Sequence, residues 1–437
     1  MKLFRHLIAL LFLAQSLSAQ TAAPFQDGER WCALGDSITH GGRYQHLIYL
    51  FYATRFPDRT IDLFNCGISG DSAGGALRRL EDDVLSHKPS VVTIMLGMND
   101  VSRNLYEPGP ASPETVKKRE KALADHSQNM KLLAEKLTAA GARLIFFTPT
   151  PFDDTSTMDK PNLPGVNGAL AQSADYAQVL AKTFNGGLVD FHKPMTELNL
   201  AQQKLDPKAT LIGPDRVHPQ DVGHLVMLYL FLKAQGISPI ISSRSEDAAG
   251  KTDFQFTWTE TALPFPVPDA CQAALKLVPF IADLNQEPLK VTGLPAGKYK
   301  LSIDDQAIAS FDADEFAQGI NLATLTNTPQ YQQALAAAKI NEQRSDVVKR
   351  LRTIDYVEWR MGRKIGDLSA FDFAAEAEKF IANPKNEGYV AGQGKAYLTL
   401  KPKQAEMQAQ LAGFVKDLRT ACQPKAHRFH ILREGTN

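Results

Sequence analysis

Hydrophobic and polar positions follow one rhythm in the first half of the chain. Short runs rich in Val, Ile, Leu and Phe are separated by longer stretches in which apolar residues recur at helical spacing. This alternation is typical of a parallel sheet with helices on both faces. The pattern predicts strands at residues 31–36, 60–66, 90–97, 142–148 and 187–191, and helices at 44–55, 115–140, 169–184 and 221–234.

Beyond residue 236 the rhythm changes. Short alternating runs between residues 250 and 325, with a turn at 294–297, predict a small β-rich unit. Apolar stripes then predict long helices over 329–364 and 404–422, and the chain ends in a predicted strand at 427–432. Because no repeat or low-complexity linker separates the halves, we expect an accessory α+β region, 237–437, packed on the first domain. Three side chains of this region could contact a sugar: Tyr356, Trp359 and Arg360. Packing between helices is the favoured interpretation of all three.

The N-terminus has the pattern of a targeting segment. Lys2 and Arg5 precede an apolar stretch, residues 7–14, that ends in the small residues around Ala19. We therefore expect a signal peptide over residues 1–19 and an exported protein, periplasmic or extracellular. The apolar stretch is too short to span a bilayer, so no stable membrane insertion is expected.

Composition sets limits on partners and on redox chemistry. The 437 residues contain 48 Lys plus Arg and 48 Asp plus Glu, which gives no sign of a nucleic-acid partner. Four cysteines allow three pairings, of which a Cys271–Cys422 disulfide is our guess. Cys32 and Cys66, near the ends of neighbouring predicted strands, suit buried thiols equally well. No spacing of Cys and His indicates a metal site.

The candidate chemistry begins where the first predicted strand ends. Gly35-Asp36-Ser37-Ile38-Thr39 places a serine at that point, and a serine needs a base, a group that orients the base and oxyanion donors to act as a nucleophile. Ligands of parallel sheets bind beyond the carboxyl ends of the strands. Three further segments supply the other groups, two at strand ends and one just before the last helix: Gly67-Ile68-Ser69-Gly70-Asp71, Gly97-Met98-Asn99-Asp100 and Asp215-Arg216-Val217-His218-Pro219.

In this order, the four segments resemble the SGNH (GDSL-type) esterase and lipase family over about residues 30–236. The resemblance implies a flavodoxin-like three-layer α/β/α domain, 28–236, that works without metal or organic cofactor. It implies that Ser37 is the nucleophile, His218 the general base and Asp215 the residue that orients the base. The implied oxyanion donors are the N–H groups of Ser37 and Gly70 and the side-chain amide of Asn99.

Each of these residues also has an ordinary structural use. Ser37 and Asn99 suit helix N-caps, Gly70 suits a positive φ, and Asp215 suits an Asx-turn. His218 before a proline suits a surface loop. The joint occurrence of all five in the family order favours the catalytic interpretation.

Two other constellations compete for the site. Asp190-Phe191-His192 also follows a strand, but the family pattern places acid and base three residues apart on a late loop, so we expect His192 to be structural. Gly70-Asp71-Ser72-Ala73-Gly74 matches the nucleophile elbow of hormone-sensitive-lipase-like α/β-hydrolases, with His40-Gly41-Gly42 as a partial oxyanion motif and Asp190 and His218 downstream. Against this alternative, only one strand precedes His40, and Arg43 replaces the fourth glycine.

The function that follows is an exported carboxylic ester hydrolase with an acyl-Ser37 intermediate, acting on small-molecule or glycan esters. Export and balanced charge favour O-acetyl groups on carbohydrate. An O-acyltransferase or a lipase with the same residues, and a non-catalytic glycan-binding protein on the same scaffold, stay open as alternatives. The sequence leaves the oligomeric state open.

Overall fold

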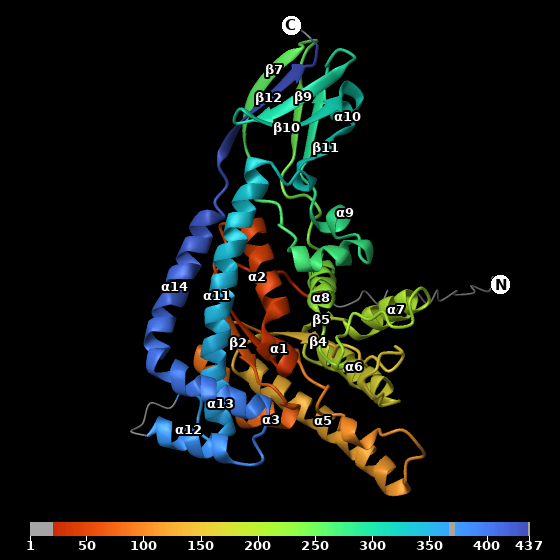
Figure 1. Ribbon diagram of the computed structural model, residues 1–437, viewed down its shortest axis with the longest axis vertical. Coiled ribbons are helices and arrows are strands. Elements are labelled where there is room, and N and C mark those ends of the chain that lie inside the picture. Colours follow the sequence, from red (N-terminus) through yellow and green to blue (C-terminus); the bar gives the residue numbers. More distant parts are fainter. Residues whose placement is uncertain (1–20, 367–371, 436–437) are drawn as a thin grey trace, which may run out of the picture.

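The computed structural model describes residues 21–366 and 372–435. The predicted signal peptide, residues 1–19, lies outside the described residues. A parallel-sheet domain forms one end of an elongated molecule and a β-rich unit forms the other, and the long helix α11 (Pro329–Arg360) runs from the β-rich unit along the side of the sheet domain (Figure 1).

The sheet of the first domain has five parallel strands in the order β2-β1-β3-β4-β5. Gly35 at the end of β1 pairs with Gly67 of β2 and with Met95 of β3, so these three strands end at the same level. This strand order is flavodoxin-like, and its switch point lies between β1 and β3. The predicted strands and the three-layer fold are confirmed; the strands are β1 (Glu29–Gly35), β2 (Ile61–Gly67), β3 (Val91–Met95), β4 (Arg143–Phe147) and β5 (Gly187–Val189).

Both faces of this sheet are buried, which explains the continuous apolar runs in the sequence. Alternate residues of β1 point to opposite faces. Trp31 and Ala33 pack with α2 and α8 on one face, whereas Cys32 and Leu34 pack with α3, α5 and α6 on the other. The helices of this domain are α1 (Ser37–Gly41), α2 (Arg43–Arg55), α3 (Ala73–Arg78), α4 (Leu80–Asp83), α5 (Pro113–Ala139), α6 (Val166–Thr183), α7 (His192–Gln203) and α8 (Asp221–Ala234).

The β-rich unit contains two small sheets. One has four antiparallel strands in the order β10-β9-β12-β7, and the other has three strands in the order β11-β8-β6. The last strand of the chain, β12, lies inside the first sheet between β9 and β7. The strands are β6 (Arg244–Asp247), β7 (Asp253–Thr259), β8 (Pro288–Thr292), β9 (Lys298–Ile303), β10 (Gln306–Asp312), β11 (Ile320–Asn321) and β12 (Ala426–Arg433), beside helix α10 (Ala313–Gln318).

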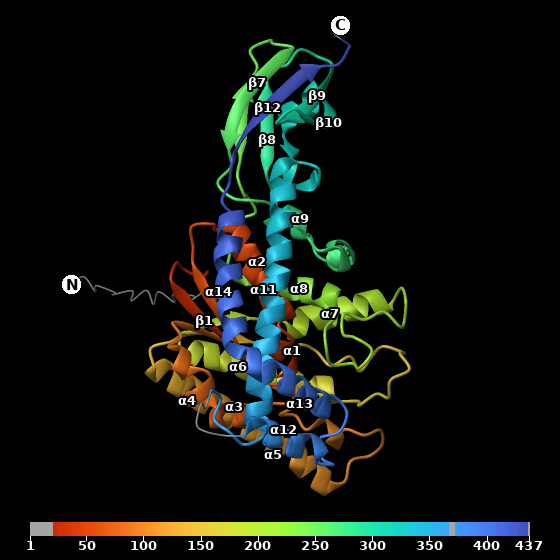
Figure 2. The same cartoon turned by 60° about the vertical axis from the view of Figure 1, so that its left-hand side comes forward.

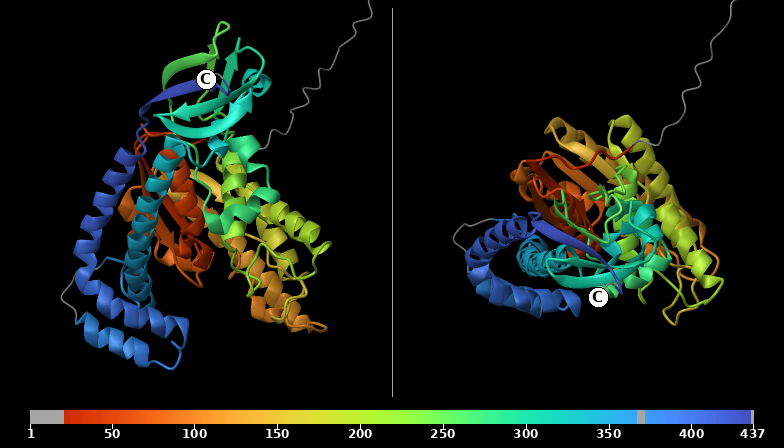
Figure 3. Two further views of the ribbon diagram at one scale, coloured as in Figure 1. Left: turned by 45° about the horizontal axis from the view of Figure 1, so that its top comes forward. Right: turned by 90° about the horizontal axis from the view of Figure 1, so that it is seen from above.

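Between β11 and β12 the chain forms a helical arm, α11 to α14. Helix α11 descends along the sheet domain, the short helices α12 (Phe373–Ala382) and α13 (Tyr389–Leu400) turn at its far end, and α14 (Gln404–Ala421) returns beside α11 (Figure 2). Seen from other directions, the arm stands against one side of the sheet domain (Figure 3). Both long helices confirm the prediction from the apolar stripes. Tyr356 is buried against the His40 ring, with the ring centroids 5.2 Å apart, so it packs rather than facing solvent.

The connection between β7 and β8 returns to the sheet domain. Its short helices η3 (Asp269–Lys276) and α9 (Phe280–Leu284) place Cys271 and Phe280 in the same core cluster as α2 and α8. The core of the first domain therefore includes residues well beyond 236.

All four cysteines are free and buried. Cys271 lies in the core cluster with α8, whereas Cys422 packs against Tyr49 and Leu418 in a separate cluster between α14 and α2. The guessed Cys271–Cys422 disulfide is therefore wrong, because the two thiols belong to different parts of the core.

Candidate active site

Ser37 lies at the sharp change of direction from β1 into α1. Asp36 caps this helix, because its carboxylate accepts a hydrogen bond of 3.0 Å from the Ile38 N–H. The turn packs closely on the neighbouring strand: a Cβ atom at Gly67 would lie 2.2 Å from the backbone nitrogen of His40. Glycine at this position therefore allows α1 to lie against β2 and holds Ser37 at the edge of the sheet.

Ser37, His218 and Asp215 form a continuous hydrogen-bonded chain. His218 Nε2 lies 2.7 Å from Ser37 Oγ, and His218 Nδ1 lies 2.5 Å from Asp215 Oδ2. The second carboxylate oxygen of Asp215 accepts hydrogen bonds from the N–H groups of Val217 and His218, at 3.0 and 2.9 Å. The imidazole is thus placed with one nitrogen facing the hydroxyl and the other facing the acid, although the three residues are separated by up to 181 positions in the chain.

Arg216, between the acid and the base, anchors this loop. It adopts a positive φ of 65° and is buried. Its guanidinium donates hydrogen bonds of 2.8 to 3.1 Å to four backbone carbonyls of the loop at residues 153–160. We assigned Arg216 no role from the sequence, because nothing near it in the chain indicates that it binds carbonyl groups about sixty residues away.

Burial and hydrogen bonding shift the pKa values around Ser37 in different directions. Partial burial alone would raise the pKa of Asp215, but the hydrogen bonds from the N–H and imidazole of His218 and from the Val217 N–H outweigh it and lower that pKa. Burial raises the pKa of Asp36 to about 7, against the opposing effects of the Ile38 N–H and of His218. Burial lowers the pKa of His40 to about 3, so this imidazole is neutral. The Ser69 N–H donates to its Nδ1 at 3.1 Å.

Three hydrogen-bond donors face the cleft beside Ser37. Gly70 has a φ of 80°, and among the hydrogen bonds of the described residues none uses the N–H of Ser37 or of Gly70. Asn99 donates one amide hydrogen to the Asp71 carbonyl at 2.8 Å, which leaves its other amide hydrogen for a ligand. Such a set of donors can stabilise an oxyanion formed at an acyl carbon.

The cleft is lined from two sides and has a volume of about 500 Å³. The sheet domain contributes Ser37, Gly70, Asn99, Arg103 and His218 together with neighbouring residues. The helical arm contributes two pairs of residues one turn apart, which the sequence did not connect with the site: Lys349 and Thr353 of α11, and Tyr389 and Gln393 of α13.

Tyr389 stands at the rim of this cleft. The residue is 56% exposed, and its hydroxyl lies 3.3 Å from Ser69 Oγ. An exposed aromatic ring with a polar end suits contact with a ring-shaped ligand. The accessory region therefore supplies part of the cleft wall.

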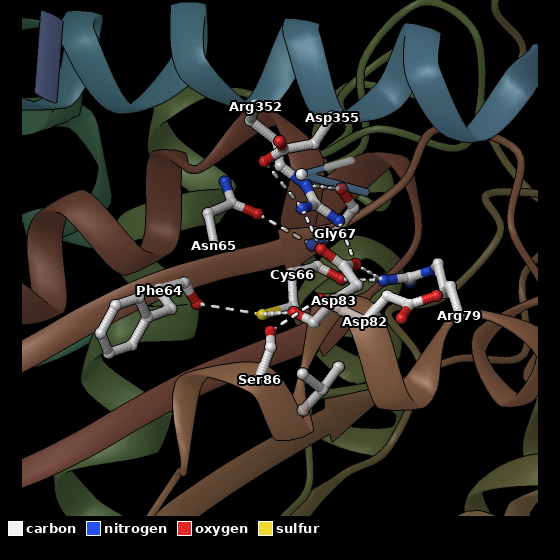
Figure 4. A network of polar contacts seen from close by, with 12 residues as sticks. Phe64, Asn65, Cys66, Gly67, Arg79, Asp82, Asp83, Ser86, Arg352 and Asp355 are labelled. Atoms are coloured by element: carbon white, nitrogen blue, oxygen red, sulfur yellow. Dashed lines mark hydrogen bonds and ion pairs between the residues drawn. The ribbon is translucent and has the colours of Figure 1, made fainter. Parts of the chain in front are cut away.

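A buried ionic network connects the helical arm to the loop that carries Gly70 (Figure 4). Arg352 of α11 donates to both oxygens of Asp83 at 2.6 Å and to the Gly67 carbonyl at 2.7 Å. Arg79 pairs with the same Asp83 and also donates to Asp71 at 2.8 Å. Burial alone would raise the pKa of Asp83, but the two guanidiniums outweigh it and lower that pKa to about 2. The network thus extends from the arm to Asp71, whose carbonyl holds Asn99.

The two competing constellations lie elsewhere. Ser72 is the N-cap of α3, where its hydroxyl accepts a hydrogen bond of 3.3 Å from the Gly75 N–H. His192 Nε2 lies 2.9 Å from the Asn167 side-chain oxygen, whereas Asp190 accepts a hydrogen bond from Thr148. The structure thus brings His218 to Ser37 and gives Ser72 and His192 other partners.

Metal binding would need a cluster of suitable ligands. Among residues 21–366 and 372–435, no group of three His, Cys, Asp or Glu side chains is placed to hold a metal ion. In the same part of the chain, none of the helices combines the length and the apolar composition that a membrane span requires.

A parallel sheet of this order, with a hydrogen-bonded Ser-His-Asp set at the carboxyl ends of its strands, defines the class of α/β/α serine hydrolases. Residues 33–226 match the model of the GDSL-like lipase/acylhydrolase family, so the sheet domain belongs to this SGNH-type family. It is a carboxylic ester hydrolase.

Two curated relatives match parts of the chain. The chain is 27% identical over 225 residues to an acetylxylan esterase of Geobacillus stearothermophilus, and the match covers 48% of this chain and 94% of that esterase. It is 30% identical over 140 residues to esterase TesA of Pseudomonas aeruginosa, which covers 32% of this chain and 58% of TesA.

A solved structure matches both regions of the chain. It is described as a gut microbial diltiazem-metabolizing enzyme, is 29% identical, and has a TM-score of 0.84 over 95% of this chain and 100% of its own. The combination of sheet domain, helical arm and β-rich unit therefore occurs in at least one other protein.

Proposed function

We propose that this esterase removes O-acetyl groups from carbohydrates through an acyl-Ser37 intermediate, and that it is exported. The observation that carries the catalytic part is the hydrogen-bonded chain from Ser37 Oγ through His218 to Asp215, beside free backbone donors. It supplies the nucleophile, the base and the orienting acid in contact with one another.

The proposed reaction has two halves. His218 Nε2 takes the proton of Ser37 Oγ as the oxygen attacks the acyl carbon, and the N–H groups of Ser37 and Gly70 and the amide of Asn99 bind the oxyanion. His218 then gives the proton to the departing alcohol. A water molecule, activated by the same nitrogen, attacks the acyl-serine and releases the carboxylic acid and Ser37. Asp215 holds the imidazole in the required tautomer throughout.

The substrate assignment is supported by two features outside the Ser-His-Asp set. The matched Geobacillus protein is an acetylxylan esterase, so acetyl esters of xylan are its substrates by name. In this chain the cleft of about 500 Å³ opens beside the exposed ring of Tyr389, which suits the ring of a sugar.

The first experiment measures hydrolysis of p-nitrophenyl acetate, p-nitrophenyl octanoate and acetylated xylooligosaccharides. We expect the acetyl esters to be preferred, and we expect Ser37→Ala to abolish turnover. Ser72 is a nearby serine that caps α3, so Ser72→Ala is the matched control and should retain turnover. Loss of activity only in Ser72→Ala, or a preference for the octanoate, would overturn the proposal; transfer of acetyl to added sugar instead of water would identify an acyltransferase.

Export is tested separately. Expression with residues 1–19 included in a bacterial host should give a processed protein in the periplasm or medium whose first residue is Gln20. Recovery of the unprocessed chain from the cytoplasm alone would contradict export.

A further inference from the structure

Two side chains that line the cleft around Ser37, Arg103 and Lys349, carry a positive charge. Arg103 lies on the short helix η2 (Arg103–Leu105), which follows β3 and Asn99, and Lys349 lies on α11 of the helical arm. No Asp or Glu is among the described residues that line the cleft. The two cations therefore reach the same space from the sheet domain and from the arm.

Neither cation has an anionic partner among the described residues. Arg103 and Lys349 form no ion pair within 4.0 Å and no side-chain hydrogen bond, and the Nη1 atom of Arg103 is buried without an acceptor. A buried donor without an acceptor is destabilising, so such a group in a cleft calls for an explanation. By contrast, neighbouring Arg43 is paired with Asp221 and Glu342.

The nearby carboxylates are engaged elsewhere. Asp215 accepts hydrogen bonds from His218 and Val217. Glu342, two turns before Lys349 on α11, is held by Arg43 and by His46. Asp36 is buried beneath the cleft and holds the Ile38 N–H. The free charge that faces a ligand in the cleft is therefore positive.

We propose that the alcohol part of the substrate carries a carboxylate, which Arg103 and Lys349 bind together. The planar fork of a guanidinium matches a carboxylate, and a lysine on the second wall adds a mobile charge. This inference rests on the proposed function: if the acyl group is acetyl, most of the cleft is left for the alcohol part. The substrate class is then an acetyl ester of an acidic sugar, a uronate, with its ring beside Tyr389.

The test compares two aryl acetates that differ in one charge, 4-acetoxybenzoate and its neutral methyl ester. The kcat/KM of each is divided by its rate of hydroxide hydrolysis, which corrects for the leaving group. We expect the corrected ratio of anionic to neutral ester to exceed one for the parent enzyme. It should fall about tenfold in Lys349→Met and in Arg103→Met, since loss of one ionic contact of about 1.4 kcal/mol is a factor of ten.

Three controls separate the charge effect from structural damage. Lys349→Arg keeps the charge and should keep the ratio. Arg350→Met removes the next side chain of α11, which is exposed and outside the cleft, and should leave the ratio at its parent value. Raising NaCl from about 0.02 M to about 0.5 M should lower the ratio of the parent, because salt screens ionic contacts in an open cleft.

The proposal is overturned if the parent shows no preference for the anionic ester or if both variants keep the parent ratio. It is also overturned if Lys349→Met and Arg103→Met lower the turnover of mono-4-nitrophenyl succinate more than that of 4-acetoxybenzoate, because the succinate ester carries its carboxylate on the acyl side. Failure of the proposed function is distinguished by calorimetry of the two acetoxybenzoates with Ser37→Ala protein. If 4-acetoxybenzoate binds the Ser37→Ala protein more tightly than its methyl ester does, the subsite is supported without any turnover. This binding of 4-acetoxybenzoate should be weaker in the Ser37→Ala, Lys349→Met double variant.

Discussion

The side-chain amide of Asn99 has two hydrogens that can serve two different acceptors. One amide hydrogen holds the Asp71 carbonyl at 2.8 Å, and the other faces the cleft. We expect Asn99→Ala to lower kcat for p-nitrophenyl acetate roughly 100- to 1,000-fold, the usual effect of removing one oxyanion donor. Asn104→Ala, which removes an exposed amide from the same loop, should leave kcat within threefold by the same measure. A kcat near that of the parent in Asn99→Ala would show that this amide does not stabilise the transition state.

Asp36 should make stability depend on pH. Its ordinary pKa of 3.8 is raised by burial to about 7, so folding favours the protonated form. Its contribution to stability is therefore full below about pH 4 and is lost as the pH rises toward 7. Asp36→Asn keeps an acceptor for the Ile38 N–H but cannot ionise.

We therefore expect the free energy of unfolding of Asp36→Asn, relative to the parent, to increase between about pH 5 and about pH 8. One pKa unit corresponds to about 1.4 kcal/mol, so the full change is a few kcal/mol. Urea unfolding at both pH values measures it, with the exposed Asp58→Asn as control. An equal difference at the two pH values would show that Asp36 ionises normally in the folded protein.

Among the structural elements, α11 determines how the arm is fixed to the active-site loops. Arg352 is buried and holds both Asp83 and the Gly67 carbonyl, at the start of the loop that carries Gly70. Arg352→Met leaves Asp83 with Arg79 alone, and breaking a buried pair typically costs about 3–5 kcal/mol. We expect that loss in urea unfolding together with a lower kcat, because the loop is no longer held. Arg350→Met on the exposed face should change neither, and an unchanged kcat in folded Arg352→Met would separate the arm from the chemistry.

Helices and strands with a regular apolar pattern could be predicted from the sequence. The Ser-His-Asp set was predicted from the order of four short motifs. The strands of the parallel sheet and the helices α5, α8, α11 and α14 have apolar spacing that one segment reveals. Helix α13 was missed because Gly392 and Gly394 weaken its helical signal, and β11 was missed because it has only two residues. The cleft wall was not predictable: Lys349 and Tyr389 lie more than 300 residues from Ser37 and reach it only through tertiary packing. The guessed disulfide failed for the same reason, since cysteine count says nothing about distance.

At the scale of the whole molecule, the accessory region is closed by its last strand. The chain leaves the β-rich unit through α11, passes the active-site cleft and returns through α14 to insert β12 between β7 and β9. The arm is therefore held at its base by the pairing of β12 with β7 and with β9. Farther along α11, it is held by the ion pair of Arg352 with Asp83. Both attachments place Lys349 and Tyr389 at the cleft, so the geometry of the active site depends on the complete chain.

This dependence predicts that the family domain does not stand alone in this protein. The family match ends at residue 226, but the core cluster of α2 and α8 continues through Phe265, Phe280 and Leu284. A chain ended after Gly236 would expose that apolar surface and leave Asp83 without Arg352. We expect it to aggregate and to show neither a cooperative unfolding transition nor hydrolysis of p-nitrophenyl acetate, whereas a chain ended after Gly435 should match the parent in both. A soluble chain of 236 residues that unfolds cooperatively and keeps the parent kcat/KM would show that neither the fold nor the hydrolysis of this ester needs the accessory region.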